Sequence, residues 1–127
     1  MKQWLLLCLC LLLCLTACGE VEKEPYVNIT AEEAKLLMDT ETNYVILDVR
    51  TQSEFDEKHI PGAILLPDYE VAERAEEVLK EKDQLILVYC RSGRRSKKAS
   101  EELVKLGYTN IREFGGIIDW PYDTVEN

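Results

Sequence analysis

The sequence predicts an α/β fold in which a parallel sheet is covered by helices on both faces. Two runs of aliphatic and β-branched residues, 44–49 and 85–89, have the continuous apolar character of strands that are buried on both sides. Segments with helical periodicity alternate with these strands, and such alternation requires crossover connections between parallel neighbours. Because ligands of open parallel sheets bind at the carboxyl ends of the strands, functional residues are expected there.

The first two helices are predicted to begin at capping boxes. A short strand at 26–29 leads into Thr30-Ala31-Glu32-Glu33, whose hydroxyl and carboxylate suit the free N–H groups of a helix start, and this helix is expected to run to Asp39. After the first buried strand, Thr51-Gln52-Ser53-Glu54 repeats the pattern. The short helix that it opens stops before the turn residues Ile60-Pro61-Gly62.

The second half of the domain alternates in the same way. An apolar strand is predicted at 63–66 and an amphipathic helix at 69–80. The second buried strand is followed by a helix at 95–106, which Gly107 ends. A last strand at 111–114 precedes a pair of glycines, so the sequence contains five candidate strands in all.

The amino terminus has the features of a signal peptide. Lys2 precedes an apolar run, 5–15, that is shorter than a membrane span. The sequence Leu15-Thr16-Ala17-Cys18 resembles the lipobox of bacterial lipoproteins, in which the peptide is removed before the cysteine and the thiol carries lipid. An ordinary signal peptide that is cut near Ala17 and a short transmembrane anchor are the alternatives.

Three regions are therefore expected: a lipoprotein signal peptide at 1–17, a lipidated tether at 18–25 and one domain at 26–127. The tether is short, charged and without apolar periodicity. The protein is expected at the cell envelope, exported and lipid-anchored, on the outer face of the cytoplasmic membrane or on the periplasmic side. Lipid on Cys18 would hold it there.

The composition limits the partners of this protein. Asp and Glu number 24 against 15 Lys and Arg, which gives a net charge of −9. An acidic surface argues against nucleic acid, whose phosphates require Lys and Arg, and against electrostatic adhesion to anionic lipid. Attachment to a membrane therefore has to come from the lipid anchor at Cys18.

One cysteine remains free after these assignments. Cys8, Cys10 and Cys14 lie inside the peptide that is discarded, and Cys18 is expected to be acylated. Cys90 then has no partner for an internal disulfide in a compartment where thiols tend to be oxidised. An unpaired thiol outside the cytoplasm is either buried and inert or used in chemistry.

The residues after Cys90 favour use in chemistry. Cys90 ends the second buried strand and is followed by the turn Arg91-Ser92-Gly93-Arg94-Arg95. A chain reversal at Gly93 would point successive N–H groups inward, and the following helix would add its positive end, so that the loop forms an anion cradle with the sulfur at its floor. Its three arginines favour thiolate, the reactive form, over thiol. The structural alternatives are a solvated helix start and a cysteine that serves as a small buried hydrophobe.

The length of this loop separates two chemistries. Cysteine phosphatases have five residues between Cys and Arg, whereas four separate Cys90 from Arg95, and Ser96 occupies the position of the phosphatase arginine. The shorter loop resembles the C-x-x-G-x-R active loop of the rhodanese family of sulfurtransferases.

Two further segments extend this resemblance. "ILDVRTQSEFDEKHIPGA", residues 46–63, resembles the rhodanese pattern of D-V-R, E-F and H-I-P-G-A, and "FGGIIDW", residues 114–120, resembles its closing G-G and Trp. Lys58 stands where many members have glycine before the histidine. The resemblance implies a single rhodanese domain with a five-stranded parallel sheet and helices on both faces. It also implies a covalent persulfide on Cys90 as the only carrier, with no metal and no organic cofactor.

The resemblance assigns a role to each residue of the loop. The Cys90 thiolate would attack the outer sulfur of a small anionic donor, thiosulfate or polysulfide, and pass it to a thiol, to cyanide or to a thiol redox protein. The N–H groups of residues 91–95, Ser92 and Gly93 included, would stabilise the thiolate and the persulfide. Arg91 and Arg94 would orient the donor, and Arg95 would tie the loop to the domain.

Three residues outside the loop are expected to support it. Asp48 and Arg50 match the D-x-R of the family; Arg50 is expected to pair with Glu54, and Asp48 to brace the active loop by hydrogen bonds.

His59 is the only histidine and is interpreted as a turn residue whose hydrogen bonds go to the backbone, so no histidine-based metal site is predicted.

Three functions remain open at this point. The favoured one is a thiosulfate or polysulfide sulfurtransferase at the cell envelope. The second is a carrier or binding module that takes up sulfane sulfur and passes it on without useful turnover. The third, a cysteine phosphatase, is disfavoured by the length of the loop.

Overall fold

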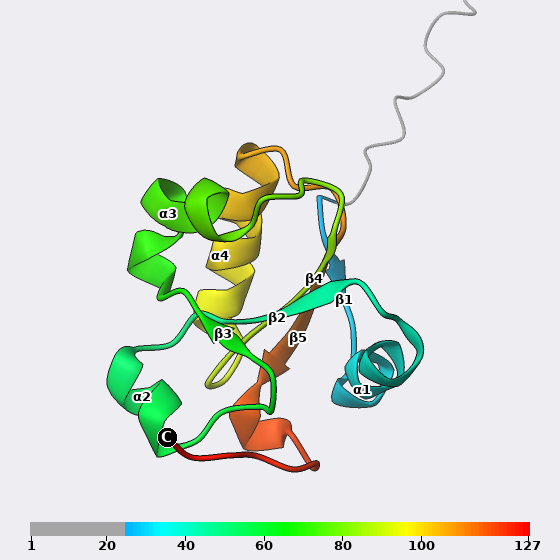
Figure 1. Ribbon diagram of the computed structural model, residues 1–127, viewed down its shortest axis with the longest axis vertical. Coiled ribbons are helices and arrows are strands. Elements are labelled where there is room, and N and C mark those ends of the chain that lie inside the picture. Colours follow the sequence, from blue (N-terminus) through cyan, green and yellow to red (C-terminus); the bar gives the residue numbers. More distant parts are fainter. Residues whose placement is uncertain (1–24) are drawn as a thin grey trace, which may run out of the picture.

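The computed structural model describes residues 25–127, and its centre is one five-stranded sheet (Figure 1). The spatial order is β1-β5-β4-β2-β3, and every neighbouring pair is parallel, as predicted. The strands are β1 Val27–Asn28, β2 Tyr44–Asp48, β3 Ile64–Leu65, β4 Leu85–Cys90 and β5 Ile111–Gly116. The expected signal peptide, and all of the expected tether except Pro25, lie outside the described residues.

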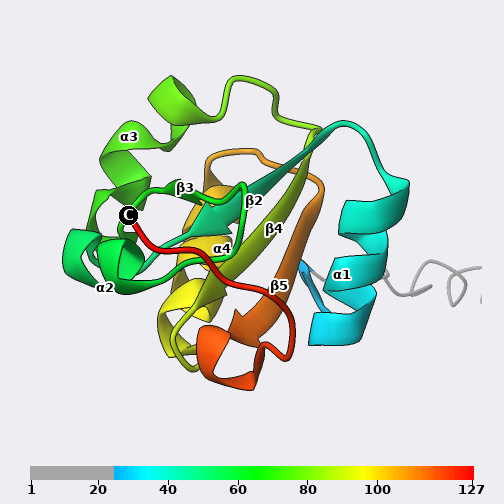
Figure 2. The ribbon, with the colours of Figure 1, turned by 60° about the horizontal axis from the view of Figure 1, so that its bottom comes forward.

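Helices cover both faces of the sheet. α1 lies on one face and α3 and α4 lie on the other, while α2 lies near the carboxyl ends of the strands (Figures 1 and 2). Within residues 25–127, no helix is long and apolar enough to cross a membrane. The helices are α1 Ala31–Thr40, α2 Gln52–Glu57, α3 Val71–Val78 and α4 Arg94–Lys105, with short 3₁₀ turns η1 Asp68–Glu70 and η2 Ile117–Asp119.

Both predicted helix starts are confirmed by their hydrogen bonds, but the complete capping box forms only at α2. The Thr30 hydroxyl accepts the Glu33 N–H at 3.1 Å. At α2 the capping is reciprocal, because the Thr51 hydroxyl accepts the Glu54 N–H and the Glu54 carboxylate accepts the Thr51 N–H. Local sequence alone therefore determines where these two helices begin.

The third predicted helix, at 69–80, is shorter than expected. It begins as the 3₁₀ turn η1 after Pro67, and α3 ends at Val78 because Leu79 adopts an extended backbone. The Leu79 side chain is buried, and its carbonyl accepts a hydrogen bond from the Tyr108 hydroxyl at 2.6 Å. A tertiary contact thus decides this boundary.

Successive side chains of each strand point to opposite faces of the sheet and divide the core into two layers. On β4, Ile86, Val88 and Cys90 pack in the layer that contains residues of α3 and α4. Leu87 and Tyr89 pack in the layer that contains Ala34 of α1. The period of two in a strand therefore directs the side chain of Cys90 toward the α4 side of the sheet.

A bulge joins the carboxyl ends of β4 and β5. Val88 pairs with Glu113, but Cys90 pairs with Gly116, so β5 contains one extra residue over this stretch. Gly115 adopts φ +84°, the left-handed conformation that such a bulge requires. Gly116 is extended, but a Cβ there would lie 1.9 Å from the Arg91 carbonyl oxygen. The loop after Cys90 therefore packs directly on the backbone of β5.

We expect Gly116→Ala to destabilise the domain and displace this loop. The added methyl group meets backbone atoms of Arg91 and Ser92, which cannot move aside as a flexible side chain could. The expected loss in the free energy of unfolding, measured by urea denaturation, is about 1–3 kcal/mol. In NMR spectra, the largest shifts should fall on the amides of these two loop residues.

Gly115→Ala is the matched control, because a Cβ there meets nothing within 4 Å and only the left-handed backbone is strained. It should lower stability by about 1–2 kcal/mol without selectively moving the 91–92 amides. A Gly116→Ala variant with wild-type stability and an unmoved loop would contradict the packing described above.

Candidate active site

The Cys90 side chain points into the loop that follows it. Its sulfur accepts a hydrogen bond from the Gly93 N–H at 3.0 Å. Gly93 adopts φ +105°, and a Cβ at this position would lie 3.4 Å from the Gly115 Cα, so glycine suits both the turn and the close approach. Only 1% of Cys90 is exposed.

The backbone around the sulfur favours a negative charge there. Of the amides in the loop, that of Gly93 makes the hydrogen bond to Cys90. Arg94 and Arg95 begin α4, and N–H groups in the first turn of a helix have no carbonyl partner within it. The Arg91 carbonyl is held by the Ile118 N–H at 3.2 Å, which fixes the other side of the loop. The positive end of α4 therefore lies beside the sulfur.

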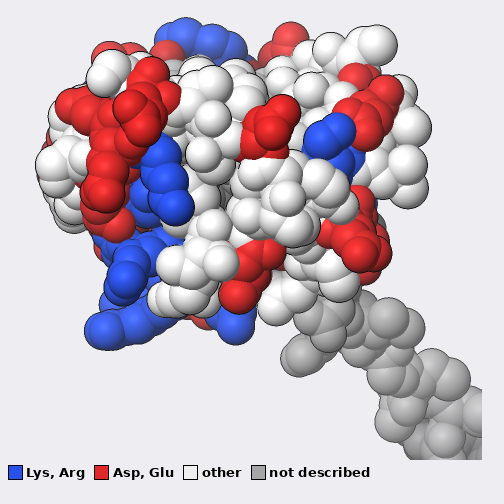
Figure 3. Space-filling view, turned by 90° about the horizontal axis from the view of Figure 1, so that it is seen from below, with Lys and Arg blue, Asp and Glu red and all other residues white. Residues whose placement is uncertain are grey.

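The arginines of the loop differ in exposure. Arg91 and Arg94 are exposed, whereas Arg95 is partly buried. On the face of the molecule seen from below, Lys and Arg side chains gather at one corner next to a band of Asp and Glu side chains (Figure 3). In a protein with a net charge of −9, this corner offers anions a local site of attraction.

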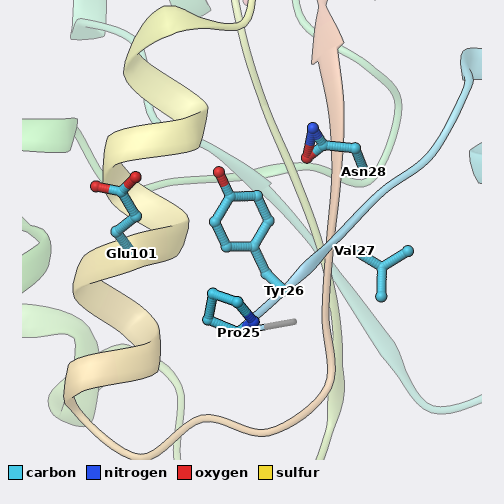
Figure 4. A pocket seen from close by; sticks show the side chains of 5 residues that line it. All are labelled: Pro25, Tyr26, Val27, Asn28 and Glu101. Atoms are coloured by element: carbon cyan, nitrogen blue, oxygen red, sulfur yellow. The ribbon is translucent and has the colours of Figure 1, made fainter. Parts of the chain in front are cut away.

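A cavity of about 270 Å³ adjoins the loop. Its polar lining mixes both charges and its remaining lining is aliphatic; the residues are Arg50, Glu54, Glu57, Lys58, Arg91, Ile117 and Ile118. A larger hollow, of about 430 Å³, lies between the 25–28 segment and Glu101 of α4 (Figure 4). None of the residues that line this hollow belongs to the loop, whereas Arg91 of the loop lines the smaller cavity.

Arg95 joins the start of α4 to α2. Its guanidinium donates two hydrogen bonds to the Glu54 carboxylate, at 2.7 and 2.9 Å. The pKa of Glu54 is lowered to about 2, chiefly by Arg95 and further by bonds from Thr51, against the effect of burial. The pKa of Arg95 is raised, first by Glu54, with a smaller electrostatic contribution from Cys90. A permanent positive charge is therefore fixed near the sulfur.

The expected pair between Arg50 and Glu54 is wrong. Arg50 instead pairs with Asp48, with 2.7 Å between Nη2 and Oδ2, and both side chains are buried. The expectation that Asp48 braces the active loop is also wrong, because its other side-chain partner is the Tyr89 hydroxyl at 2.6 Å. Since Glu54 is already engaged by Arg95, two separate charge pairs form.

The buried pair supports the end of the sheet rather than the loop. Arg50 Nη2 also donates to the Lys58 carbonyl at 2.7 Å, and the Tyr89 hydroxyl accepts the Ile60 N–H at 3.1 Å. Burial, followed by the nearby Asp48 charge, raises the pKa of Tyr89. These bonds tie β2 and β4 to the turn after α2.

Ser96 and Glu113, which sequence reasoning missed, also lie beside Cys90. The Ser96 Oγ lies 3.4 Å from the sulfur and 2.6 Å from Oε1 of Glu113, whose side chain is 2% exposed. A signal for Glu113 does exist in the sequence. It is an acidic residue two positions after Ile111 in a predicted strand, so it shares the buried face of that residue.

His59 bonds to the backbone, as predicted. Its Nδ1 lies 2.8 Å from the Phe55 carbonyl oxygen, and its ring stacks on that of Phe55. In the part of the chain that the structure describes, no group of three or more His, Cys, Asp or Glu residues could hold a metal ion.

Comparison with known proteins identifies relatives of this chain. The sequence profile described as "Rhodanese-like domain" matches residues 30–121. Thiosulfate sulfurtransferase PspE of Escherichia coli is 38% identical over 58% of this chain and 70% of its own length. A protein named sulfurtransferase from Allochromatium vinosum is 39% identical over 66% of this chain and 77% of its own length. The putative sulfur carrier protein YrkF of Bacillus subtilis is 39% identical over 73% of this chain but only 50% of its own length.

Solved structures agree with the fold. A rhodanese with anions from E. coli matches with a TM-score of 0.62 and 34% identity, over 66% of this chain and 99% of that one. The Alr3790 protein from Anabaena matches with a TM-score of 0.71 and 29% identity, over 77% and 91%. The predicted α/β architecture is therefore shared with solved relatives.

We expect Glu54→Gln to lower stability in a pH-dependent way. The pKa of Glu54 in the folded state lies below its ordinary value of 4.5, so its contribution is fully present above that value and is lost as the pH falls toward 2. The difference in the free energy of unfolding between wild type and variant should be about 1 kcal/mol at neutral pH and should shrink between about pH 5 and 2. Urea denaturation across this range measures it.

Glu57→Gln, on the same helix, is the control for loss of one negative charge, because Glu57 is exposed and forms no ion pair with another residue of the 25–127 region. A pH-independent difference for Glu54→Gln, or the same curve for both variants, would contradict the assigned pair.

Proposed function

The chain belongs to the rhodanese-like family, and from that premise we propose that it moves sulfane sulfur from thiosulfate or a polysulfide to a thiophilic acceptor through a persulfide on Cys90. The observation that carries this proposal is the hydrogen bond from the Gly93 N–H to the Cys90 sulfur at 3.0 Å. This backbone N–H group points at the sulfur of Cys90, which is the one free cysteine among the described residues and lies beside the positive end of α4.

The proposed first step is a displacement at sulfur. The Cys90 thiolate forms a bond to the outer sulfur of thiosulfate, and sulfite leaves with the electron pair of the sulfur–sulfur bond that breaks. The enzyme is left with a persulfide anion, so total charge is conserved. The Gly93 N–H and the nearby Arg95 charge stabilise the anion at each stage. We propose that no metal or organic cofactor takes part.

The low exposure of Cys90 favours a small donor. With 1% of the residue exposed, a bulky reagent has little access to the sulfur. A persulfide places its outer sulfur about 2 Å beyond the first, which brings it nearer to the acceptor. Arg91 lies both on the loop and in the adjoining cavity, and together with the exposed Arg94 it supplies positive charge for an anionic donor.

A sulfane-sulfur carrier is the second candidate. The same burial that excludes bulky reagents from Cys90 would slow release to a free acceptor, and a docked thiol redox protein would then be needed to remove the sulfur. Rapid turnover with cyanide or a small thiol would favour the enzyme. Stable persulfide that only a protein thiol discharges would favour the carrier. The four-residue loop opposes the third function, phosphate hydrolysis.

We also propose that lipid on Cys18 anchors the protein at the cell envelope, with residues 18–25 as the tether. The support is the lipobox resemblance at 15–18 and an acidic composition that provides no electrostatic attachment to anionic lipid. The donor and the acceptor of sulfane sulfur would then have to be available outside the cytoplasm.

Cyanolysis tests the role of Cys90. After incubation with thiosulfate, the wild-type protein should carry one additional sulfur atom on the peptide that contains Cys90, and cyanide should release it as thiocyanate. Cys90→Ser should lower thiocyanate formation at least about a thousandfold, because it removes the nucleophile. Cys18→Ser is the matched control and should retain the activity. Equal thiocyanate yields from wild type and Cys90→Ser would refute catalysis by this residue.

Mass spectrometry of the mature protein from cell membranes tests the anchor. The amino-terminal residue should be Cys18 bearing acyl groups, and Cys18→Ala should shift the protein from the membrane fraction to the soluble or secreted fraction. Cys14→Ala, inside the expected signal peptide, should leave the location unchanged. An unmodified mature terminus at another residue would exclude lipidation at Cys18.

A further inference from the structure

A buried carboxylate lies beneath the active loop, and the proposed sulfur transfer does not use it. Glu113 is 2% exposed and belongs to the same sheet face as Ile111, toward α4. Its Oε1 accepts the Gly115 N–H at 2.8 Å and the Ser96 hydroxyl at 2.6 Å. Ser96 in turn lies 3.4 Å from the Cys90 sulfur, so a continuous path of hydrogen bonds joins the carboxylate to the thiol.

The Ser96 hydroxyl has one proton and three oxygen acceptors within reach. The distances are 2.6 Å to Glu113, 3.0 Å to the Gly93 carbonyl and 3.4 Å to the Gly115 carbonyl. The first lies in the range of a charge-assisted O–H···O⁻ bond, which is the strongest of the three. The proton therefore points at Glu113, and a lone pair of the Ser96 oxygen faces the sulfur. A thiol can donate to that lone pair, whereas a thiolate is repelled by it.

We propose that Glu113, acting through Ser96, keeps Cys90 protonated in the resting protein and sets the pH above which its sulfur becomes a nucleophile. Glu113 is thus a positioning residue that opposes the positive charges of the loop. The inference rests on the proposed function, because it takes Cys90 as the nucleophile.

The other charges near the sulfur do not duplicate this role. Arg95 and the Gly93 N–H favour the anion, and the exposed Arg91 and Arg94 act in the same direction. The other carboxylates on the neighbouring elements interact with arginines rather than with the sulfur. Asp48 of β2 pairs with Arg50, Glu54 of α2 pairs with Arg95, and Asp68 of η1 acts electrostatically on Arg95.

Protonation at rest gives an exported thiol a chemical advantage. Oxidants attack thiolates, and susceptibility follows thiolate character. A thiol that hydrogen-bonds to Ser96 resists such attack, while the cations beside it lower the free-energy cost of releasing its proton to water. The balance between Glu113 and the arginines therefore decides how far sulfur uptake depends on pH.

Alkylation by iodoacetamide across a range of pH tests the proposal, since this neutral reagent is not drawn in by the arginines. Glu113→Gln keeps an oxygen that can accept from Ser96 and Gly115 but removes the charge. It should move the midpoint of the rate profile to lower pH by at least about one unit, with the same limiting rate at high pH. A midpoint that is unchanged, or that moves to higher pH, overturns the proposal. So does a lower limiting rate with no change in midpoint, the result expected of a purely structural residue.

Glu101→Gln is the matched control. It makes the same chemical change at an exposed position on α4, and its midpoint should equal that of wild type. If Glu113→Gln fails to fold, carbon-13 NMR of wild-type protein replaces it. The assigned Glu113 carboxyl resonance should then show a step at the pH of the alkylation midpoint, and this step should vanish once Cys90 is alkylated. Absence of the step overturns the proposal.

The two proposals can fail separately. Alkylation requires no sulfur donor, so a shifted midpoint supports the role of Glu113 even if thiosulfate leaves no persulfide. Persulfide formation with no shift in the midpoint for Glu113→Gln leaves the sulfur transfer intact and removes only the role of Glu113.

Discussion

The close packing of the loop after Cys90 on the end of β5 is the constraint on which the site depends. Gly116 leaves no room for a Cβ against the Arg91 carbonyl, and Gly93 approaches the Gly115 Cα. This contact bends the chain back so that the Gly93 N–H reaches the Cys90 sulfur. A closed, rigid loop of this kind can stabilise an anion without reorganisation during the reaction.

Two charge pairs stabilise the region of the site, one at the end of the sheet and one at the start of α4. The buried pair of Asp48 and Arg50, with the Tyr89 hydroxyl, joins the central strands to the turn after α2. The pair of Arg95 and Glu54 joins that short helix to the start of α4. The Glu54 carboxylate also accepts the Thr51 N–H in the capping box of α2. One side chain therefore both caps α2 and bonds to Arg95 at the end of the active loop.

The site combines opposing charges at short range. Three arginines and a helix start follow Cys90 in a strongly acidic protein, and hydrogen bonds through Ser96 link the sulfur to the buried Glu113 carboxylate. In the proposal for Glu113, the balance between these charges sets how the reactivity of the sulfur depends on pH.

The sequence by itself determined the order of strands and helices, the capped starts of α1 and α2, and the position of Cys90 at the end of a buried strand. Each of these follows from residues close together in the chain, through periodicity and local hydrogen bonds. Only the tertiary structure decided that Glu54 pairs with Arg95 rather than Arg50, that Asp48 bonds Tyr89, and that Glu113 reaches Ser96. These partners are 17 to 41 residues apart, and a choice among several possible charge partners is settled by which side chains the packed elements bring together.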